Sequence, residues 1–168
     1  MTHLLILLVG MGSMPSQEAD PLKHPAVKEA LKYLGTPYKW GGSDLVKGID
    51  NSHFVSAVFK KAGLKCPAPP VTNQENHGTL VHMNPDMKTV FLNGKKVRPD
   101  KSIASFDRLK PGDRLIYQWK MDQSSGSRHT AIYIGSYQGQ KHMMVHALSK
   151  GVSVTPMWKK GYAYARRD

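Results

Sequence analysis

The first third of the chain carries apolar residues at the spacing of two helices. Over residues 25–34 the apolar positions recur every three or four residues, and a glycine follows where a helix C-terminal cap belongs. A second apolar stripe starts at about Asn51 and ends at Gly63, with Asp50 or Ser52 placed to cap its start. The members of this stripe are Phe54, Val55, Val58, Phe59 and Ala62. Both segments are therefore predicted to form helices that bury one face.

The last third of the chain has the pattern of strands. A turn over residues 111–113 precedes a segment in which Leu115, Tyr117 and Trp119 alternate. Three further strands, joined by glycine-bearing loops, are predicted over His129–Ile134, His142–Leu148 and Val152–Pro156. Because two helices precede a run of antiparallel strands, the pattern indicates an α+β domain with helices packed on one face of a meander.

A long excursion from Cys66 to Asp107 separates the helices from these strands. Its clearest element is a hairpin, in which residues 88–92 and 95–98 flank the pair Asn93-Gly94, which suits a type I′ turn. The chain has no internal repeat and no composition shift that would mark a second domain. Residues 21–168 are therefore predicted to form a single domain.

The cysteine and histidine content excludes several kinds of site. The single cysteine, Cys66, rules out an intramolecular disulfide, a four-cysteine zinc site and an iron–sulfur cluster. His77 and His82 lie five residues apart, but no third ligand is near them in the sequence, so no metal and no cofactor are expected. The longest apolar run, residues 4–10, is far too short to span a bilayer.

The charge of the chain points to an anionic partner. Its 24 Lys and Arg against 12 Asp and Glu give a net charge of +12, which suits nucleic acid, a membrane face or an acidic wall polymer. The cations are scattered, however, and no zinc-finger, RRM or KH signature accompanies them. No nucleic-acid partner is therefore expected; a DNA oligomer and the salt dependence of its binding would test that alternative.

Residues 1–20 have the composition of an export segment. A short apolar run is followed by a polar stretch, as in a secretory or lipoprotein-type leader, although the first residues contain no Lys or Arg. A disordered N-terminus is the alternative interpretation of the same segment. We expect a periplasmic or secreted protein, with these residues outside the folded domain.

The strongest chemical signal is the start of the second predicted helix. A turn rich in small residues leads into Asp50-Asn51-Ser52-His53, and a helix N-terminus lowers the pKa of a thiol and stabilises an oxyanion. His129 and His146 lie on predicted neighbouring strands and could sit side by side facing that helix end. No H-E-x-x-H, P-loop or G-x-S-x-G motif offers a competing site.

Four blocks of sequence resemble the NlpC/P60 family of cell-wall peptidases. The blocks are Tyr33–Gly42 with Gly48–Val55, Leu109–Asp113, His129–Gly135 and Val145–Ala147. Their order and spacing match the family over residues 25–156. The resemblance implies a papain-like α+β fold, with N-terminal helices packed on an antiparallel sheet, and hydrolysis of amide bonds in peptidoglycan stem peptides.

The family's catalytic residues carry over to three positions. Asn51 stands where the family has its nucleophilic cysteine, His129 matches the general base, and His146 matches the residue that orients the imidazole. The Leu8–Ser13 segment similarly resembles a lipoprotein box with methionine in place of the lipidated cysteine, so lipid cannot be attached there.

The resemblance also supplies expectations about the substrate cleft. Tyr38 matches an aromatic residue that lines the cleft, and Asp50 and Ser52 flank the nucleophile position as substrate-binding residues. The excursion over residues 66–107 is longer than is typical of the family and is expected to build a wall of the cleft.

Asn51 decides which function is expected. A carboxamide is not a nucleophile at neutral pH, so the chain as written is expected to be an inactive Cys–His–His peptidase or amidase. Cys66 cannot replace the missing thiol, because it begins a proline-rich loop far from the helix start. Either an active peptidase was altered at its nucleophile, which the second missing cysteine favours, or the chain is a natural pseudo-peptidase.

Two functions and two biological settings stay open at this stage. The first function is a peptidoglycan hydrolase scaffold, and the alternative is a non-catalytic module that binds stem peptides or a partner protein. The setting is either a housekeeping periplasmic peptidase or an antibacterial amidase effector of a secretion system. The effector setting implies an immunity protein that plugs the cleft.

Overall fold

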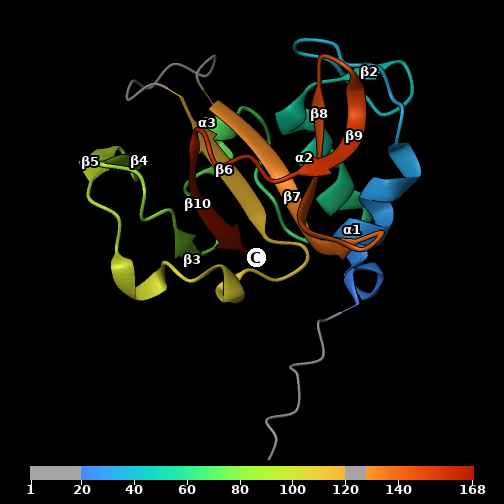
Figure 1. Ribbon diagram of the computed structural model, residues 1–168. Coiled ribbons are helices and arrows are strands. Elements are labelled where there is room, and N and C mark those ends of the chain that lie inside the picture. The colour runs from blue at the N-terminus through green and yellow to red at the C-terminus, as the bar shows by residue number, and fades with distance from the viewer. Residues whose placement is uncertain (1–19, 120–127) are drawn as a thin grey trace, which may run out of the picture.

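A computed structural model describes residues 20–119 and 128–168 of the chain (Figure 1). The interpretation of residues 1–20 as an export segment falls almost wholly outside the described residues, which begin at Asp20. Asp20 caps a short 3-10 helix, η1 (Pro21–Lys23), that leads into the first α-helix.

Both predicted helices form. The first, α1 (Pro25–Ala30), continues as the 3-10 helix η2 (Leu31–Tyr33) and ends before Gly35, whose φ of +87° confirms the left-handed C-terminal cap. The second, α2 (Asn51–Lys61), begins at the predicted residue, and Gly63 at φ +73° ends it. The two-stranded β1 (Ser43–Asp44) and β2 (Gly48–Ile49) lie between these helices.

The predicted strands form one side of a six-stranded sheet. β6 (Arg114–Gln118), β7 (Arg128–Tyr137), β8 (Gln140–Leu148) and β9 (Gly151–Pro156) are an antiparallel meander. The fold class is therefore α+β, as predicted. Figure 1 shows α1 and α2 together on one side of β7, β8 and β9.

The sheet contains two strands in addition to this meander. β10 (Tyr162–Arg167) returns to pair with β6, and β3 (Thr79–Met83) pairs with β10, so the order is β3-β10-β6-β7-β8-β9. Neither strand was predicted from the sequence. All of β10 except its last residue is buried, and β3 is buried over its last three residues, so neither has the period-two alternation of a half-exposed strand.

The excursion contains more structure than the predicted hairpin. The hairpin itself is confirmed as β4 (Val90–Leu92) and β5 (Lys95–Val97), with Asn93 and Gly94 both at positive φ. The excursion also contributes α3 (Val71–Gln74) and two 3-10 helices, η3 (Lys101–Ile103) and η4 (Phe106–Arg108).

The two faces of the sheet pack against different cores. On one face, Ile132 and Ile134 of β7 join the apolar stripes of α1 and α2. On the other, Ala131 and Tyr133 join an aromatic cluster with Tyr117, and Phe106 and Trp158 pack against its edge. Alternate residues of β7 therefore serve a helical core and an aromatic core, which fixes the register of the strand.

Candidate active site

The N-terminus of α2 is organised by the carboxylate of Asp50. This group accepts hydrogen bonds from the backbone N–H of His53 at 2.8 Å and from the Ser52 hydroxyl at 3.0 Å, and it lies 3.0 Å from Nδ1 of His53. Asp50 is therefore the N-cap, which settles the choice that the sequence left between it and Ser52. The substrate-binding roles of these two residues stay predictions.

Asn51 is the first residue of α2, and its side chain is largely buried. Its amide oxygen has no hydrogen-bond partner among the residues that the structure describes. The position lies at the positive end of the helix dipole, where backbone N–H groups favour a thiolate or an oxyanion. A neutral carboxamide makes no chemical use of that environment, because it is not a nucleophile.

A hollow opens at this end of α2. It is lined by Trp40, Gly41, Asp50, Asn51, Ser52, Pro70, Val71 and Arg128. Pro70 and Val71 belong to the excursion over residues 66–107, which therefore forms a wall of the hollow as expected. Trp40 is 72% exposed, so its indole offers an apolar surface to a ligand beside the polar helix end.

Arg128 ties this hollow to the strand that carries His129. It is the first residue of β7 and is buried, and its Nε donates to the Glu75 carboxylate at 3.0 Å. Burial raises the pKa of the Glu75 carboxyl, and the nearby charge of Arg128 opposes that rise. The start of β7, one residue before His129, is thereby fixed at the hollow that Asn51 also lines.

The two histidines meet as predicted from their strands. Nε2 of His129 lies 2.9 Å from Nδ1 of His146, and Nε2 of His146 lies 3.1 Å from the hydroxyl of Thr155 on β9. The two rings are perpendicular, and each residue is only 1% exposed. Three adjacent strands therefore supply one chain of hydrogen bonds.

This chain of hydrogen bonds has two possible proton arrangements. In one, His129 donates from Nε2 to His146, which donates from its own Nε2 to Thr155, and Nδ1 of His129 is left with a lone pair. In the other, Thr155 donates to His146, which donates to His129, and Nδ1 of His129 carries the proton. Only the first arrangement leaves Nδ1 of His129 able to act as a base, and in it His146 accepts a hydrogen bond from His129 and Thr155 accepts one from His146.

Aromatic side chains enclose the pair and keep it neutral. Trp158 lies 4.8 Å from the His146 ring and 5.4 Å from the His129 ring, and Tyr117 and Trp119 also pack against His129. Burial lowers the pKa of His129 to about 3, with a smaller contribution from His146, and lowers the pKa of His146 to about 4. Both rings are uncharged at neutral pH.

The structure does not join the histidines to Asn51. Within residues 20–119 and 128–168, no hydrogen bond links Asn51 to either ring. The rings pack with Tyr117 on the aromatic core, whereas the body of α2 packs on the opposite core. The convergence of Asn51 with His129 therefore stays a prediction.

Two other side chains named from the sequence, Tyr38 and Cys66, do not line the hollow. Tyr38 is half-buried and bridges to Ile49, and burial followed by the Asp50 charge raises the pKa of its hydroxyl. Its position close to Asp50 leaves its cleft-lining role a prediction. Cys66 packs against the helical core, where burial raises the pKa of its thiol to about 11, so it is a poor nucleophile.

Sequence reasoning missed several contributors to this region. Trp158, Thr155 and Glu75 were not singled out, although each contacts a residue of the site. No local signal identifies Glu75, because its partner Arg128 is 53 positions away. Trp40 lies within the Tyr33–Gly42 block, but the sequence alone did not show that its side chain is exposed.

Two general properties of the described residues bear on function. Residues 20–119 and 128–168 contain no group of three His, Cys, Asp or Glu side chains arranged to hold a metal ion. None of the helices in these ranges has the length and hydrophobicity required to cross a bilayer.

Comparison with protein families identifies residues 35–167 as a match to the NlpC/P60 family. A bifunctional muramidase/DL-endopeptidase, CwlT, from Bacillus subtilis is 52% identical over 136 residues, which are 81% of this chain and 32% of that protein. A murein DD-endopeptidase/LD-carboxypeptidase, MepS, from Escherichia coli is 34% identical over 87% of this chain and 63% of its own length. The chain thus spans between about a third and just under two thirds of these two relatives.

Solved structures give the same fold. The NlpC/P60 domain of the peptidoglycan hydrolase SagA has a TM-score of 0.57 and 26% identity, over 86% of this chain and 97% of that domain. An NlpC/P60 family protein from Bacillus cereus also has a TM-score of 0.57, with 27% identity over 85% of this chain and 39% of its own. These similarities confirm the expected papain-like α+β fold.

Proposed function

The chain belongs to the NlpC/P60 family, and we propose that its domain binds peptidoglycan stem peptides and is built to cleave an amide bond that Asn51 leaves uncut. One observation carries the proposal: the buried His129–His146 pair keeps a base and its orienting partner in hydrogen-bond contact. The relatives named as peptidoglycan endopeptidases support amide hydrolysis as the reaction for which this site is arranged.

The substitution Asn51→Cys supplies the missing step. Transfer of the thiol proton to Nδ1 of His129 yields a thiolate, which attacks the amide carbonyl carbon while the first turn of α2 stabilises the oxyanion. The imidazolium then gives that proton to the leaving amine as the C–N bond breaks. Water, activated by the same imidazole, hydrolyses the thioester and releases the acid product.

Digestion of purified peptidoglycan tests the proposal directly. We expect Asn51→Cys to release stem-peptide fragments, identified by their masses, whereas the unaltered chain releases none. Because His129 is needed as the base, the double variant Asn51→Cys, His129→Ala should be inactive again. Cys66, present in all three proteins, controls for any activity of an incidental thiol.

A folded Asn51→Cys protein that leaves the wall intact would overturn the hydrolase scaffold. Circular dichroism and the thermal midpoint establish folding independently of activity. The preferred function would then be the non-catalytic one, a module that binds stem peptides or a partner protein. Asn51 itself favours that alternative, since it removes the nucleophile and leaves the hollow in place.

We further place the protein outside the cytoplasmic membrane, in the periplasm or secreted, with residues 1–20 as an export segment separate from the domain. The relatives named for murein and peptidoglycan hydrolysis support this location. As a secreted effector, the chain would meet an immunity protein that fills the hollow beside Asn51. Co-purification with the product of a neighbouring gene distinguishes that setting from a housekeeping one.

A further inference from the structure

The segment that contains the β4–β5 hairpin is a basic surface that the proposed reaction does not use. Residues 88–101 include five cationic side chains and one carboxylate, Asp100, which caps the helix η3. All five cationic residues are exposed, and over the described residues none of them forms an ion pair. They are Lys88, Lys95, Lys96, Arg98 and Lys101.

Protection of an exposed strand edge accounts for only two of these cations. β4 is the inner, largely buried strand of the hairpin, and β5 is the outer strand, on which Lys95 and Lys96 are exposed. Lysines on an outer strand discourage pairing with the strands of other molecules. Lys88, Arg98 and Lys101 lie outside both strands, so protection of the edge does not explain their presence.

The backbone of β4 is held by one buried side chain of the main sheet. Gln118, the last residue of β6, accepts a hydrogen bond from the N–H of Phe91 at 2.8 Å and donates one to the carbonyl of Phe91 at 2.6 Å. The hydroxyl of Tyr164 on β10 donates to the same carbonyl at 3.3 Å. The hairpin is therefore fixed to the main sheet, although in the described residues it pairs with none of its strands.

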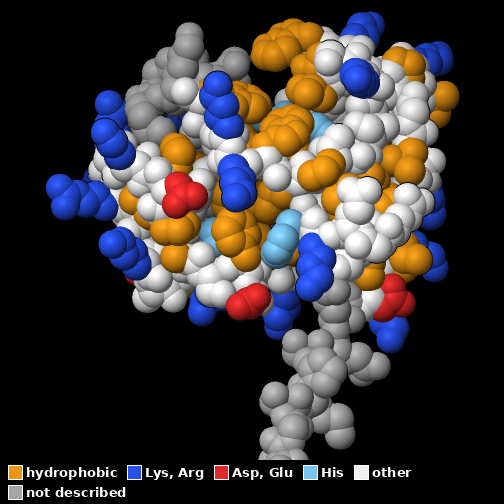
Figure 2. Space-filling view, in the orientation of Figure 1, with side chains coloured by type: hydrophobic (Ala, Val, Ile, Leu, Met, Phe, Trp, Pro, Cys, Tyr) orange, Lys and Arg blue, Asp and Glu red, His pale blue; other side chains and the backbone are white. Residues whose placement is uncertain are grey.

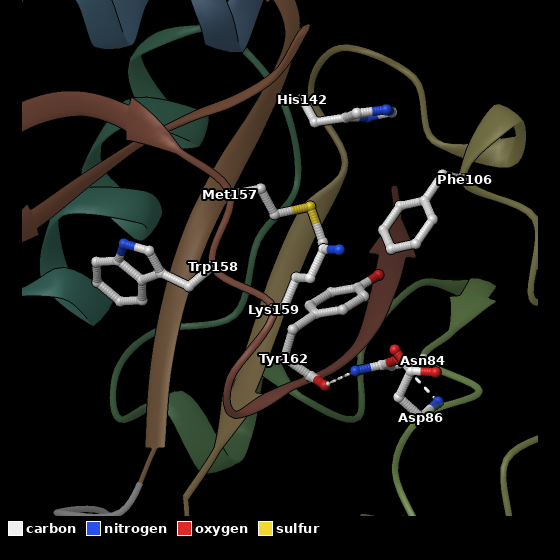
Figure 3. A pocket seen from close by; sticks show the side chains of 8 residues that line it. All are labelled: Asn84, Asp86, Phe106, His142, Met157, Trp158, Lys159 and Tyr162. Carbon is white, nitrogen blue, oxygen red and sulfur yellow. Dashed lines mark hydrogen bonds between the residues drawn. The ribbon is translucent and has the colours of Figure 1, made fainter.

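Two further contacts fix the position of the hairpin relative to the candidate active site. The guanidinium of Arg128, which lines the hollow, lies 5.6 Å from the centre of the Phe91 ring. Before the hairpin, the amide of Asn84 donates to the carbonyl of Tyr162 and accepts from the N–H of Asp86, as the dashed lines in Figure 3 show. A ligand bound to the hairpin would therefore lie at a defined distance from the hollow.

The hairpin lies at one margin of the molecule. Figure 1 shows β4 and β5 at this margin and α1 at the other. In the same orientation, Figure 2 shows Lys and Arg side chains crowded over the margin where the hairpin lies. Like charges concentrated in this way produce a local positive potential that attracts a polyanion.

Two features of the segment indicate the chemistry of that polyanion. Four of the five cations are lysines, whose ammonium groups bind phosphate as point charges, whereas recognition of carboxylates favours the planar fork of arginine. The aromatic side chain of the segment, Phe91, is buried and faces Arg128, so it cannot stack on nucleic-acid bases.

We propose that the β4–β5 hairpin binds a linear phosphodiester polymer without bases, of the poly(glycerol phosphate) type, through the five cations of residues 88–101. This inference goes beyond the proposed function and is independent of the residue at position 51. A polymer of this kind that is attached to the cell wall would raise the effective concentration of stem peptides at the hollow.

The salt dependence of binding counts the contacts. Fluorescence anisotropy of labelled poly(glycerol phosphate) measures the affinity of the unaltered chain at increasing salt concentration. Each phosphate contact contributes about −0.7 to the slope of log affinity against log salt for a single-stranded polyanion, so five contacts give a slope of about −3.5. We therefore expect the affinity to fall about a hundredfold between about 50 and 200 mM salt.

A triple variant assigns these contacts to the hairpin. Lys95→Gln, Lys96→Gln and Arg98→Gln together should reduce the slope to about −1.4, so that the same rise in salt weakens binding only about sevenfold. All three side chains are exposed and form no ion pair over the described residues, and the thermal midpoint verifies folding. Each single variant gives the same test, with a change in slope of about 0.7.

A matched control removes the same charge elsewhere. Lys60, Lys61 and Lys65 are exposed at and just beyond the C-terminal end of α2, and their replacement by Gln lowers the net charge equally. This control should keep the slope of the unaltered chain. Equal slopes in the two triple variants would overturn the proposal, because the net charge rather than the hairpin would then attract the polymer.

Two other polyanions test the chemistry of the ligand. Polygalacturonate of matched length, which carries carboxylates, should bind more weakly than poly(glycerol phosphate), and equal affinity would overturn the assignment to phosphodiesters. Tighter binding of a single-stranded DNA oligomer would replace the proposal with a nucleic-acid surface. Both outcomes leave the proposed function intact, because digestion by Asn51→Cys tests the hollow separately.

Discussion

The two halves of the candidate site differ in how they are held. The nucleophile half stands at the end of one helix, is bounded by polar groups, and opens to solvent beside the exposed Trp40. The base half lies on the sheet, with His129 and His146 almost fully buried, hydrogen-bonded to each other and enclosed by aromatic rings. On the face of the molecule that Figure 2 shows, histidine and hydrophobic side chains lie in the middle, and Lys and Arg side chains lie around them.

This difference shows which half depends on the identity of a single side chain. The histidine geometry follows from strand register and from the packing of three strands, so it persists whatever residue stands at position 51. The helix end supplies a favourable electrostatic environment for a thiolate, but chemistry there requires the thiol itself. The proposed reaction therefore depends on a thiol at position 51, whereas the fold and the base half do not.

The largest effect on activity should come from removing the hydrogen bond between His129 and His146 in the base half. In the Asn51→Cys background, His146→Ala removes the hydrogen-bond partner of His129 Nε2, and we expect kcat/KM to fall about a thousandfold because the imidazole is no longer oriented. His146→Asn, which retains a hydrogen-bonding group, should recover part of the loss. Activity that survives His146→Ala unchanged would show that His129 is oriented by other groups.

The next effect concerns the reactivity of the introduced thiol. The helix dipole and the imidazole lower the pKa of the thiol in Asn51→Cys, whereas burial raises that of Cys66 to about 11. A larger fraction of the introduced thiol is therefore ionised at pH 7, which speeds its alkylation by iodoacetamide, whereas a low-pKa thiolate is intrinsically a weaker nucleophile. We expect the net effect to be alkylation about a hundredfold faster than that of Cys66. Peptide mapping by mass spectrometry reports the two rates in one sample. Equal rates would mean that the helix end and His129 do not act on position 51.

Acidification should weaken the fold through the base half. The pKa values of His129 and His146 lie below the 6.5 of an unfolded histidine, so unfolding takes up protons and stability falls as pH drops from above 6.5 toward 4. Between pH 8 and pH 6 each ring accounts for roughly 0.8 kcal/mol, or about 1.6 kcal/mol for the two together. Urea unfolding at the two pH values measures this loss.

The same measurement sharpens the comparison between the halves. In Asn51→Cys, a thiolate beside His129 would raise the pKa of that ring, so the loss of stability at pH 6 should be smaller than in the unaltered chain. An identical loss in both proteins would place the thiol outside the reach of His129. A free energy of unfolding that rises on acidification would contradict the neutral, buried state of the pair.

The smallest effect is expected at the cap of α2. Asp50→Ala removes an acceptor of the His53 N–H and leaves the Ser52 hydroxyl without that partner, which should cost about 1 kcal/mol in the free energy of unfolding. Ser105→Ala, at the cap of the short helix η4, is the matched control and should cost less. If Asp50→Ala and Ser105→Ala lowered the free energy of unfolding equally, the Asp50 cap would stabilise the start of α2 no more than an ordinary cap of a short helix does.

The sequence predicted those parts of the fold that have local signals. The apolar stripe and the capping residue defined α2 to within a residue, and the alternation around Tyr117 identified β6. His129 and His146 could be paired because their strands are neighbours in a hairpin, where register is a local property. These features need no knowledge of distant parts of the chain.

The remaining features depend on contacts between distant segments. β10 is buried and pairs with two strands that precede it by long intervals, so its residues carry no half-exposed pattern. Glu75 and Arg128 form a buried pair across 53 positions, and Trp158 reaches the histidines from a loop after β9. Tertiary packing, rather than local propensity, determines all three.

The place of β10 in the sheet has a consequence for the kinetics of folding. β10 is inserted between β3 and β6, and the Asn84–Tyr162 hydrogen bond beside β3 and β10 spans 78 positions. The sheet therefore cannot close until nearly the whole described domain has been synthesised, and closure must overcome the entropy of a long loop. A nascent chain that has emerged only as far as β9 has the meander but lacks the strand that joins β3 to it, so the sheet is completed only after β10 has emerged.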